Sequence, residues 1–297
     1  MPPLTLGSVT TVAEIEPRRA GVLRRLITHP SGLLGALVVA AFVMIAVLGS
    51  AGMTPFPAAK QFPVDRLKPP SETYLAGTDL YGRDVASRLM EGAANSLRVA
   101  TLSVVLAGLA GTLIGVVAGF VGGLADTIIM RVMDVFFAFP ALLLALLIVA
   151  VLGPGLNSAI LAIAIVYTPI FARVARGPVL SLKMMEYVTA ARCIGASDLT
   201  ILSRHILPNI TAPLIVQLSL ALSWALLTEA SLSFLGLGTQ PPDASWGVML
   251  AESTGLSQRA PWLMVYPGIV IVLGVLGFNL LGDGLRDVLD PRMRGRM

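Results

Sequence analysis

The sequence predicts an all-α integral membrane protein with six transmembrane helices. Hydrophobic residues make up 56% of its 297 residues and charged residues 13%, and the mean hydropathy is +0.83. Soluble domains carry about 25% charged residues, so the bilayer is the expected solvent. A helix needs roughly 20 mostly apolar residues to cross a bilayer. Six stretches approach or exceed that length, namely 31–52, 96–121, 127–152, 159–177, 210–235 and 264–284.

The placement of basic residues predicts the orientation of these spans. Lys and Arg are enriched on the cytoplasmic side of membrane proteins, and four arginines in the polar segment 1–30 precede the first span. That segment is expected to be a cytoplasmic tail ending in an interfacial helix. If the spans alternate, 14 of the 21 Lys and Arg residues lie inside and six outside, with Arg98 at a boundary. Both termini, including the tail 285–297, are therefore expected in the cytoplasm.

The first apolar stretch is expected to be an uncleaved anchor. Small residues from Gly49 to Ala51 follow it, so a cleaved signal peptide is the alternative interpretation. The basic region before the stretch is long, which favours the anchor.

The segment 53–95 is the longest external connection. Its first part is rich in proline, which prevents continuous helix and predicts an extended loop. From 83 to 97 apolar residues recur three or four apart, with Arg88 and Glu91 on another face. This pattern predicts a short amphipathic helix on the outer membrane surface that leads into the second span.

Small residues and prolines predict how the core spans 96–284 pack. Four glycines in the second span form a stripe that permits close helix approach, namely Gly108, Gly111, Gly115 and Gly119. The next four spans each contain a proline that predicts a kink, namely Pro140, Pro169, Pro213 and Pro267.

The cytoplasmic segment 178–208 is far longer than a connection between two spans requires. A first helix is expected to end at Gly195, which adopts a left-handed cap without steric cost. Ser197 or Asp198 can cap a second helix that continues through Leu207 and stops at Pro208. Small residues around the turn, Ala190, Ala191 and Ala196, leave a surface that could enter a groove in another protein. A simple surface hairpin is the alternative.

The sequence offers little that could perform catalysis. The lysines are Lys60, Lys68 and Lys183, and none lies in a phosphate-binding loop, so any ATP and Mg²⁺ are expected on another chain. His29 and His205 lie at the ends of spans, and Cys193 is the single cysteine. These residues predict neither an enzyme nor a metal site, and the scattered basic residues do not form a nucleic-acid surface.

Two ionisable residues lie within the predicted spans. A charge near the bilayer centre costs roughly 2.5–3.5 kcal/mol on insertion scales, so Asp134 and Glu229 should face protein or water. Asp134 follows Arg131 by three residues, and a structural ion pair between them is the preferred interpretation. Glu229 has no such local partner. Both are candidates for a translocation path, with a hydrogen bond to a neighbouring helix as the alternative for Glu229.

Several motifs carry a family resemblance. The segment from Glu186 to Ser197 and its ending from His205 to Asn209 resemble the EAA loop of binding-protein-dependent ABC importer permeases. Thr189 and His205 depart from the Glu and Ile of that pattern, and Glu186 could supply the carboxylate one turn earlier. The resemblance implies a loop that couples the chain to an ATPase through Glu186, Ala190, Ala191, Gly195, Ala196, Ser197, His205, Leu207 and Pro208.

Further stretches are similar to the C-type permeases of the dipeptide, oligopeptide and nickel branch, at 77–84, 138–140, 232–242, 245–247 and 278–287. They imply the type I ABC importer permease fold in a bacterial inner membrane. They also imply ATP-driven import of peptides or related solutes such as nickel chelates. The implied partners are a second homologous permease, two ATP-binding subunits or domains and an extracytoplasmic solute-binding protein.

Two other classes of function compete with this resemblance. Kinked spans with Glu229 are compatible with a proton-coupled secondary transporter, but proton coupling gives no reason for the hairpin in 178–208. A membrane-embedded enzyme lacks a nucleophile and base pair. Neither alternative accounts for the ordered series of motifs.

Overall fold

The computed structural model describes residue 26 and residues 28–289. The predicted tail and interfacial helix in 1–25, together with 290–297, lie outside the described residues. Within the described range the secondary structure is helical apart from an isolated antiparallel bridge between Thr78 and Asp84. The α-helices are α2 (Pro30–Ser50), α3 (Val85–Val121), α4 (Gly123–Phe137), α5 (Ala141–Leu152), α6 (Leu156–Leu182), α7 (Glu186–Cys193), α8 (Asp198–Ile201), α9 (Leu207–Phe234), α10 (Trp246–Glu252) and α11 (Trp262–Leu289).

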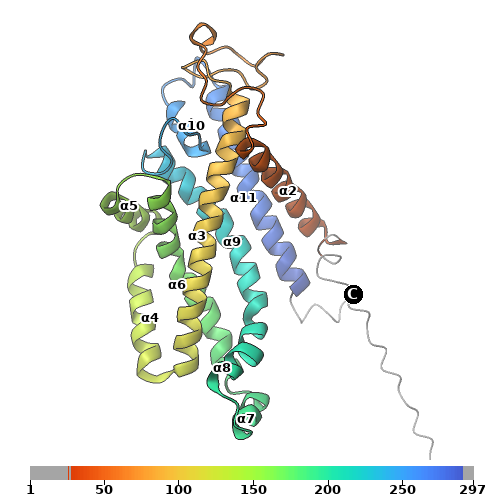
Figure 1. Cartoon of the computed structure of the whole chain (residues 1–297), viewed down its shortest axis with the longest axis vertical. Helices are drawn as coiled ribbons and strands as arrows, with labels where there is room; N and C mark the ends of the chain where they lie inside the picture. Colours follow the sequence, from red (N-terminus) through yellow and green to blue (C-terminus); the bar gives the residue numbers. More distant parts are fainter. Residues whose placement is uncertain (1–25, 27, 290–297) are drawn as a thin grey trace, which may run out of the picture.

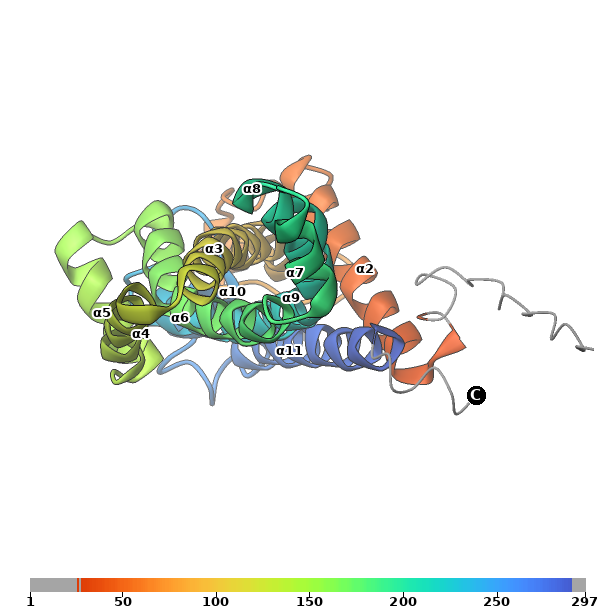
Figure 2. The same ribbon diagram turned by 90° about the horizontal axis from the view of Figure 1, so that it is seen from below.

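The spans form an elongated bundle (Figure 1). Among the described residues, five helical segments are long and apolar enough to cross a membrane, and the pair α4 and α5 makes a sixth if it crosses as one. These segments coincide with the six predicted stretches. Seen along the bundle, α4 and α5 lie on one flank and α2 and α11 on the other (Figure 2).

The third predicted span is broken rather than kinked. α4 and α5 meet at an angle of 91°. Pro140 has extended backbone and precedes the first residue of α5, which fits the preference of the residue type for helix starts. The predicted single span 127–152 is therefore two short helices joined at a corner.

The predicted glycine stripe brings α3 against α6. A methyl group at Gly111 or Gly115 would fall on the carbonyl oxygens of Thr168 and Ala172. Only glycine permits this backbone contact. α3 thereby becomes the central helix, and it also packs against α2 and α9.

The predicted surface helix at 83–97 is wrong. These residues are the first turns of α3, which runs without a break from Val85, and Asp84 caps it by accepting from the amide of Ser87 at 2.8 Å. The side chain of Arg88, which the periodicity put on a different face from the apolar residues, is only 1% exposed. Its ionic partners come from distant segments, so local pattern alone could not locate them.

The proline-rich loop between α2 and α3 contains no continuous helix, as predicted, but it consists of turns and bends with one short 3₁₀ turn, Pro63–Asp65. Tyr74 donates to the carboxylate of Asp65 at 2.7 Å, and Lys68 forms an ion pair with the same carboxylate. The hydrogen bonds from Lys68 and Tyr74 hold the pKa of Asp65 below its ordinary value. The end of the bundle that carries this loop and α10 is called the loop end (Figure 1).

Candidate functional site

The segment 184–206 projects from the opposite end of the bundle, below α3 and α6 in Figure 1. Its backbone follows the prediction at the turn. α7 ends before Gly195, whose φ of 84° lies in the left-handed region. The side chain of Ser197 then accepts from the amide of Thr200 at 3.3 Å and caps α8. This element, α7 with its turn and α8, is called the hairpin, and its end of the bundle the hairpin end.

The second helix of the hairpin does not stop at Pro208, contrary to the prediction. After α8 the chain makes one π-helical turn, Leu202–Ile206, and continues directly into α9. Pro208 occupies the second position of α9, directly after the π-helical turn, so its missing amide falls where the regular α-helical hydrogen bonds are already interrupted. The side-chain amide of Asn209 donates to the carbonyl oxygen of His205 at 2.6 Å. The hairpin is therefore joined rigidly to a span.

The hairpin rests on an apolar base. Val188, Ile201 and Ile206 are fully buried, and they pack with Val116 of α3 and Val179 of α6. Burying a Val or Ile side chain contributes about 1.5–3 kcal/mol. Packing of this kind fixes the hairpin to three spans at once.

Most of the residues that the resemblance assigned to coupling lie at the surface, on the hairpin or in the turn and first residues of α9 that follow it. Glu186, Ala190, Gly195, Ser197, Leu207 and Pro208 are exposed, whereas Ala196 and His205 are half-buried. Ala191, expected on the smooth surface, is only 7% exposed and belongs to the apolar base. The ring of His205 lies 5.9 Å from that of Tyr187.

An exposed apolar tip was not predicted from the sequence. Met184, Ile194 and Leu199 are 77%, 86% and 75% exposed. Leu199 also lines an apolar cavity together with Gly108 and Val116 of α3. Ile194 and Leu199 lie on either side of the Gly195 turn. An apolar residue on each side of a turn that was expected at the surface is the feature of the sequence that could have located this tip.

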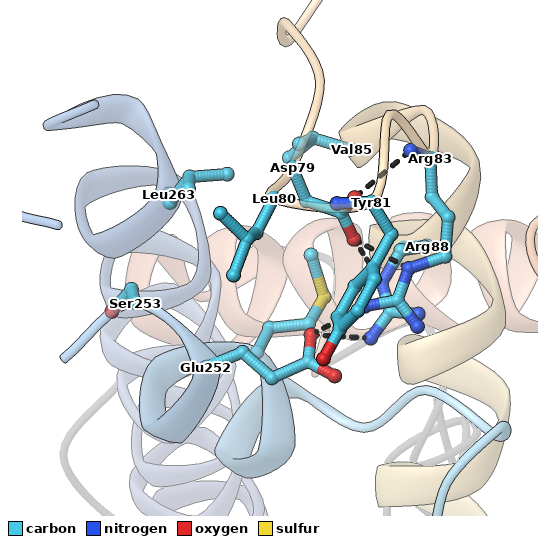
Figure 3. A pocket seen from close by; sticks show the side chains of 10 residues that line it. Asp79, Leu80, Tyr81, Arg83, Val85, Arg88, Glu252, Ser253 and Leu263 are labelled. Atoms are coloured by element: carbon cyan, nitrogen blue, oxygen red, sulfur yellow. Dashed lines mark hydrogen bonds and ion pairs between the residues drawn. The ribbon is translucent and has the colours of Figure 1, made fainter. Parts of the chain in front are cut away.

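A cluster of three buried charges and the half-buried Glu252 at the loop end was also missed (Figure 3). Arg83 and Arg88 donate to the same carboxylate oxygen of Glu252 at 2.9 and 2.8 Å, and Arg83 also contacts Asp79 at 2.5 Å. The other oxygen of Asp79 accepts from the amides of Tyr81 and Arg83 at 2.9 Å each. We call Asp79, Arg83, Arg88 and Glu252 the loop-end ion cluster. It joins the loop, α3 and α10 around a cavity of about 90 Å³.

Glu229 of α9 is completely buried. One carboxylate oxygen accepts from the hydroxyl of Ser233 at 2.7 Å, one turn along the same helix, and the other has no hydrogen-bond partner among the described residues. The hydroxyl of Ser233 also accepts from the amide of Thr239 at 3.1 Å. A local partner therefore exists, in contrast to the sequence expectation, and it is a hydroxyl group.

Asp134 does not form the predicted ion pair with Arg131. Its carboxylate instead accepts from Arg173 of α6 at 2.7 Å, and that guanidinium lies 4.0 Å from the centre of the Phe137 ring. A second carboxylate of α4, Asp126, pairs with Arg176 of α6 through two hydrogen bonds of 2.5 and 2.6 Å. The carboxylates of α4 thus attach this helix to α6.

Comparison with known proteins identifies relatives of this chain. Residues 111–295 match the family described as "binding-protein-dependent transport system inner membrane component". The dipeptide transport system permease protein DppC of Alkalihalophilus pseudofirmus is 45% identical, over 88% of this chain and 86% of its own. The di/tripeptide transport system permease protein DppC of Pseudomonas aeruginosa is 44% identical over 90% of each chain. The glutathione transport system permease protein GsiD of Escherichia coli is 44% identical over 92% of this chain and 90% of its own.

Among solved structures, an inward-facing form of the MetNI methionine ABC transporter has a similar fold. The TM-score is 0.56 at 18% identity, covering 68% of this chain and 96% of that one. At this identity the similarity concerns the fold, which is the predicted type I importer permease fold. Together with the family match and the relatives, it leads to one conclusion. The chain belongs to the family of binding-protein-dependent transport system inner membrane components.

Proposed function

We propose that this chain is the permease subunit of an ATP-driven importer for short peptides. The observation that carries the proposal is the 44–46% identity over most of the chain to permeases of dipeptide, peptide, di/tripeptide and glutathione transport systems. The solute is carried and not chemically altered. Family membership leaves the proton-coupled alternative without an observation in its favour.

The hairpin is the part of the chain that couples it to the ATPase in this proposal. The sequence contains no phosphate-binding loop, so partner subunits bind ATP and Mg²⁺. The exposed tip offers apolar side chains that a groove can cover, and amphipathic helices bind other proteins in this manner. The base packs on α3, α6 and α9, so a displacement of the tip moves these spans as a unit.

The proposed complex contains a second homologous permease, two ATP-binding subunits and an extracytoplasmic solute-binding protein. The hairpin and both termini lie in the cytoplasm, in agreement with the charge asymmetry. The loop end then faces the solute-binding protein. Glu229 and Asp134, the predicted path residues, support walls of the translocation path through their bonds to Ser233 and Arg173.

The test of the proposal is reconstitution of the chain with these partners in proteoliposomes. Accumulation of a labelled dipeptide should require the solute-binding protein and ATP on the ATPase side. Replacement of Ile194 by Asp should weaken retention of the ATPase, whereas Val64→Asp, on a 93% exposed residue of the loop, is the matched control. Uptake driven by a proton gradient without the ATPase would refute the proposal.

Orientation is tested separately by cysteine labelling. In a chain with Cys193 replaced by serine, cysteines at Ala59 and Ser257 should react with an impermeant thiol reagent outside intact cells. A cysteine at Ser181 should not react. Labelling at 181 would reverse the assignment of the two ends.

A further inference from the structure

A groove runs along α3 beside α2, separate from the loop-end ion cluster. It consists of two cavities of about 570 and 640 Å³. Both are lined by Ser50, Ala94 and Asn95, so they form one continuous groove. It begins at the loop end and descends along the first part of the α3 span.

Opposite charges lie at the two ends of this groove. Glu91 and Asp243 line its outer cavity, and Arg98 lines its inner cavity. Positions 91, 95 and 98 share one face of α3, because residues three, four and seven apart lie on the same side of a helix. Seven residues correspond to a rise of about 10.5 Å between Glu91 and Arg98.

Arg98 is the unusual member of this set. Its side chain is exposed, and no other described residue forms an ion pair or hydrogen bond with it. The part of α3 that contains no charged residue starts at the next residue, Val99. A guanidinium facing hydrocarbon is unfavourable, whereas the groove beside it also presents polar groups from Asn95 and Thr101. The charge is therefore available to a ligand in the groove.

We propose that this groove binds a short zwitterionic peptide during transport, with its ammonium group at Glu91 and Asp243 and its carboxylate at Arg98. This inference rests on the proposed function and adds the recognition of substrate termini by the permease itself. An extended chain spans about 3.3–3.6 Å per residue, so a tripeptide of about 10 Å matches the separation of the two charged ends. A dipeptide is shorter than this separation, and the flexible side chains of Glu91 and Arg98 can extend toward each other to contact both of its ends.

The chemistry suits transient recognition. Arginine binds a carboxylate through a planar pair of N–H donors, which selects that group over a neutral amide. Asp243 and Arg98 are exposed and Glu91 is half-buried, so each contact is partly screened by solvent and remains weak. A site on a transport path must release its ligand as readily as it binds it.

The first test compares a labelled tripeptide with its C-terminal amide. Initial uptake rates are measured for complexes containing the parent chain, Arg98→Gln, Arg98→Lys, or the control Arg131→Gln, an exposed arginine on α4 outside the groove. The same solute-binding protein delivers both peptides, so its own preference cancels when rate ratios are compared. Arg98→Gln should lower the acid-to-amide ratio about fivefold, the size of one exposed charge contact. Arg98→Lys should retain most of the ratio, and Arg131→Gln should leave it unchanged.

The second test does not depend on transport. In the Cys193→Ser background, Ala94→Cys places a thiol where the two cavities meet, and Ser257→Cys provides an exposed control outside the groove. Tripeptide should slow the reaction of a maleimide with position 94 in the assembled complex, and the amide should slow it less. Position 257 should react equally with and without peptide.

Two results would overturn the inference while leaving the proposed function intact. In the first, the parent complex transports peptide, and the Arg98→Gln complex has the same ratio of uptake rates for the acid and the amide as the parent. The other is a thiol at position 94 that reacts in the isolated chain but is blocked in the complex without peptide, which would show that the second permease covers the groove. A parent complex without ATP-dependent peptide uptake would instead refute the proposed function.

Discussion

At the loop end, charged side chains from Asp79 to Glu252 are buried and paired within the chain, whereas the hairpin end is held by apolar side chains such as Val188 and Ile201 and exposes Ile194 and Leu199. At the loop end the carboxylates of Asp79 and Glu252 are paired within the chain, whereas one nitrogen of Arg88 is buried without a hydrogen-bond partner among the described residues. The hairpin end leaves apolar surface in water, which is unfavourable unless another protein covers it. The comparison indicates that the two ends differ in how they are held: ionic pairs between distant segments hold the loop end, and apolar packing holds the base of the hairpin.

The largest effect is expected from breaking the loop-end ion cluster. Arg88→Met removes a guanidinium that is 1% exposed. Arg83 is then the one remaining ionic partner of Glu252 and Asp79 among the described residues. Loss of one partner from a buried ion pair costs about 3–5 kcal/mol. Thermal unfolding of the purified complex should shift to a clearly lower temperature. Arg66→Met, on an exposed residue of the same loop, is the control and should unfold like the parent.

A smaller effect is expected at Glu229, between the two ends. Glu229→Gln keeps an oxygen that can accept from Ser233 and should insert and unfold like the parent within about 1 kcal/mol. Glu229→Leu leaves the buried hydroxyl of Ser233 without its acceptor and should cost about 1–3 kcal/mol. Unfolding temperature and uptake are measured for both. A Leu variant as stable as the parent would show that the carboxylate is dispensable.

At the hairpin end the expected loss is in binding and not in stability. A side chain at Gly195 meets no atom within 4 Å, but φ is 84° there, so both Gly195→Ala and Gly195→Arg carry a backbone cost of about 1 kcal/mol. Only Arg adds bulk and an unpaired charge to a docking surface. The Gly195→Arg variant should therefore retain the ATPase about tenfold more weakly than the Gly195→Ala variant does. Equal retention, measured by co-purification, would mean that the hairpin is a surface feature only.

The sequence predicted features whose causes are local. Apolar runs located the six spans, Gly195 located the turn of the hairpin, and Ser197 its second cap. The errors concern partners that are distant along the chain. Arg88 bonds to Glu252, 164 residues away, and Asp134 to Arg173, 39 residues away. The periodicity of one helix identifies a face but not what covers it, so the predicted surface helix and the predicted Arg131 pair were both wrong.

Acid is expected to have the smallest effect, and it tests the comparison because carboxylates hold the loop end whereas apolar side chains hold the base of the hairpin. The pKa of Asp65 is lowered below the ordinary value of 3.8 by Lys68 and Tyr74. A carboxyl group with a depressed pKa stabilises the folded loop fully above that ordinary value, and the contribution is lost as the pH falls through the lower, folded-state pKa. Hydrogen exchange in 63–78 should therefore accelerate, relative to the intrinsic rate, as the pH is lowered below about 4. Asp65→Asn should show the faster exchange already at neutral pH, with little further change in acid. The hairpin, whose base is apolar, should keep its protection over the same range, and equal acid sensitivity at both ends would contradict the distinction drawn between them.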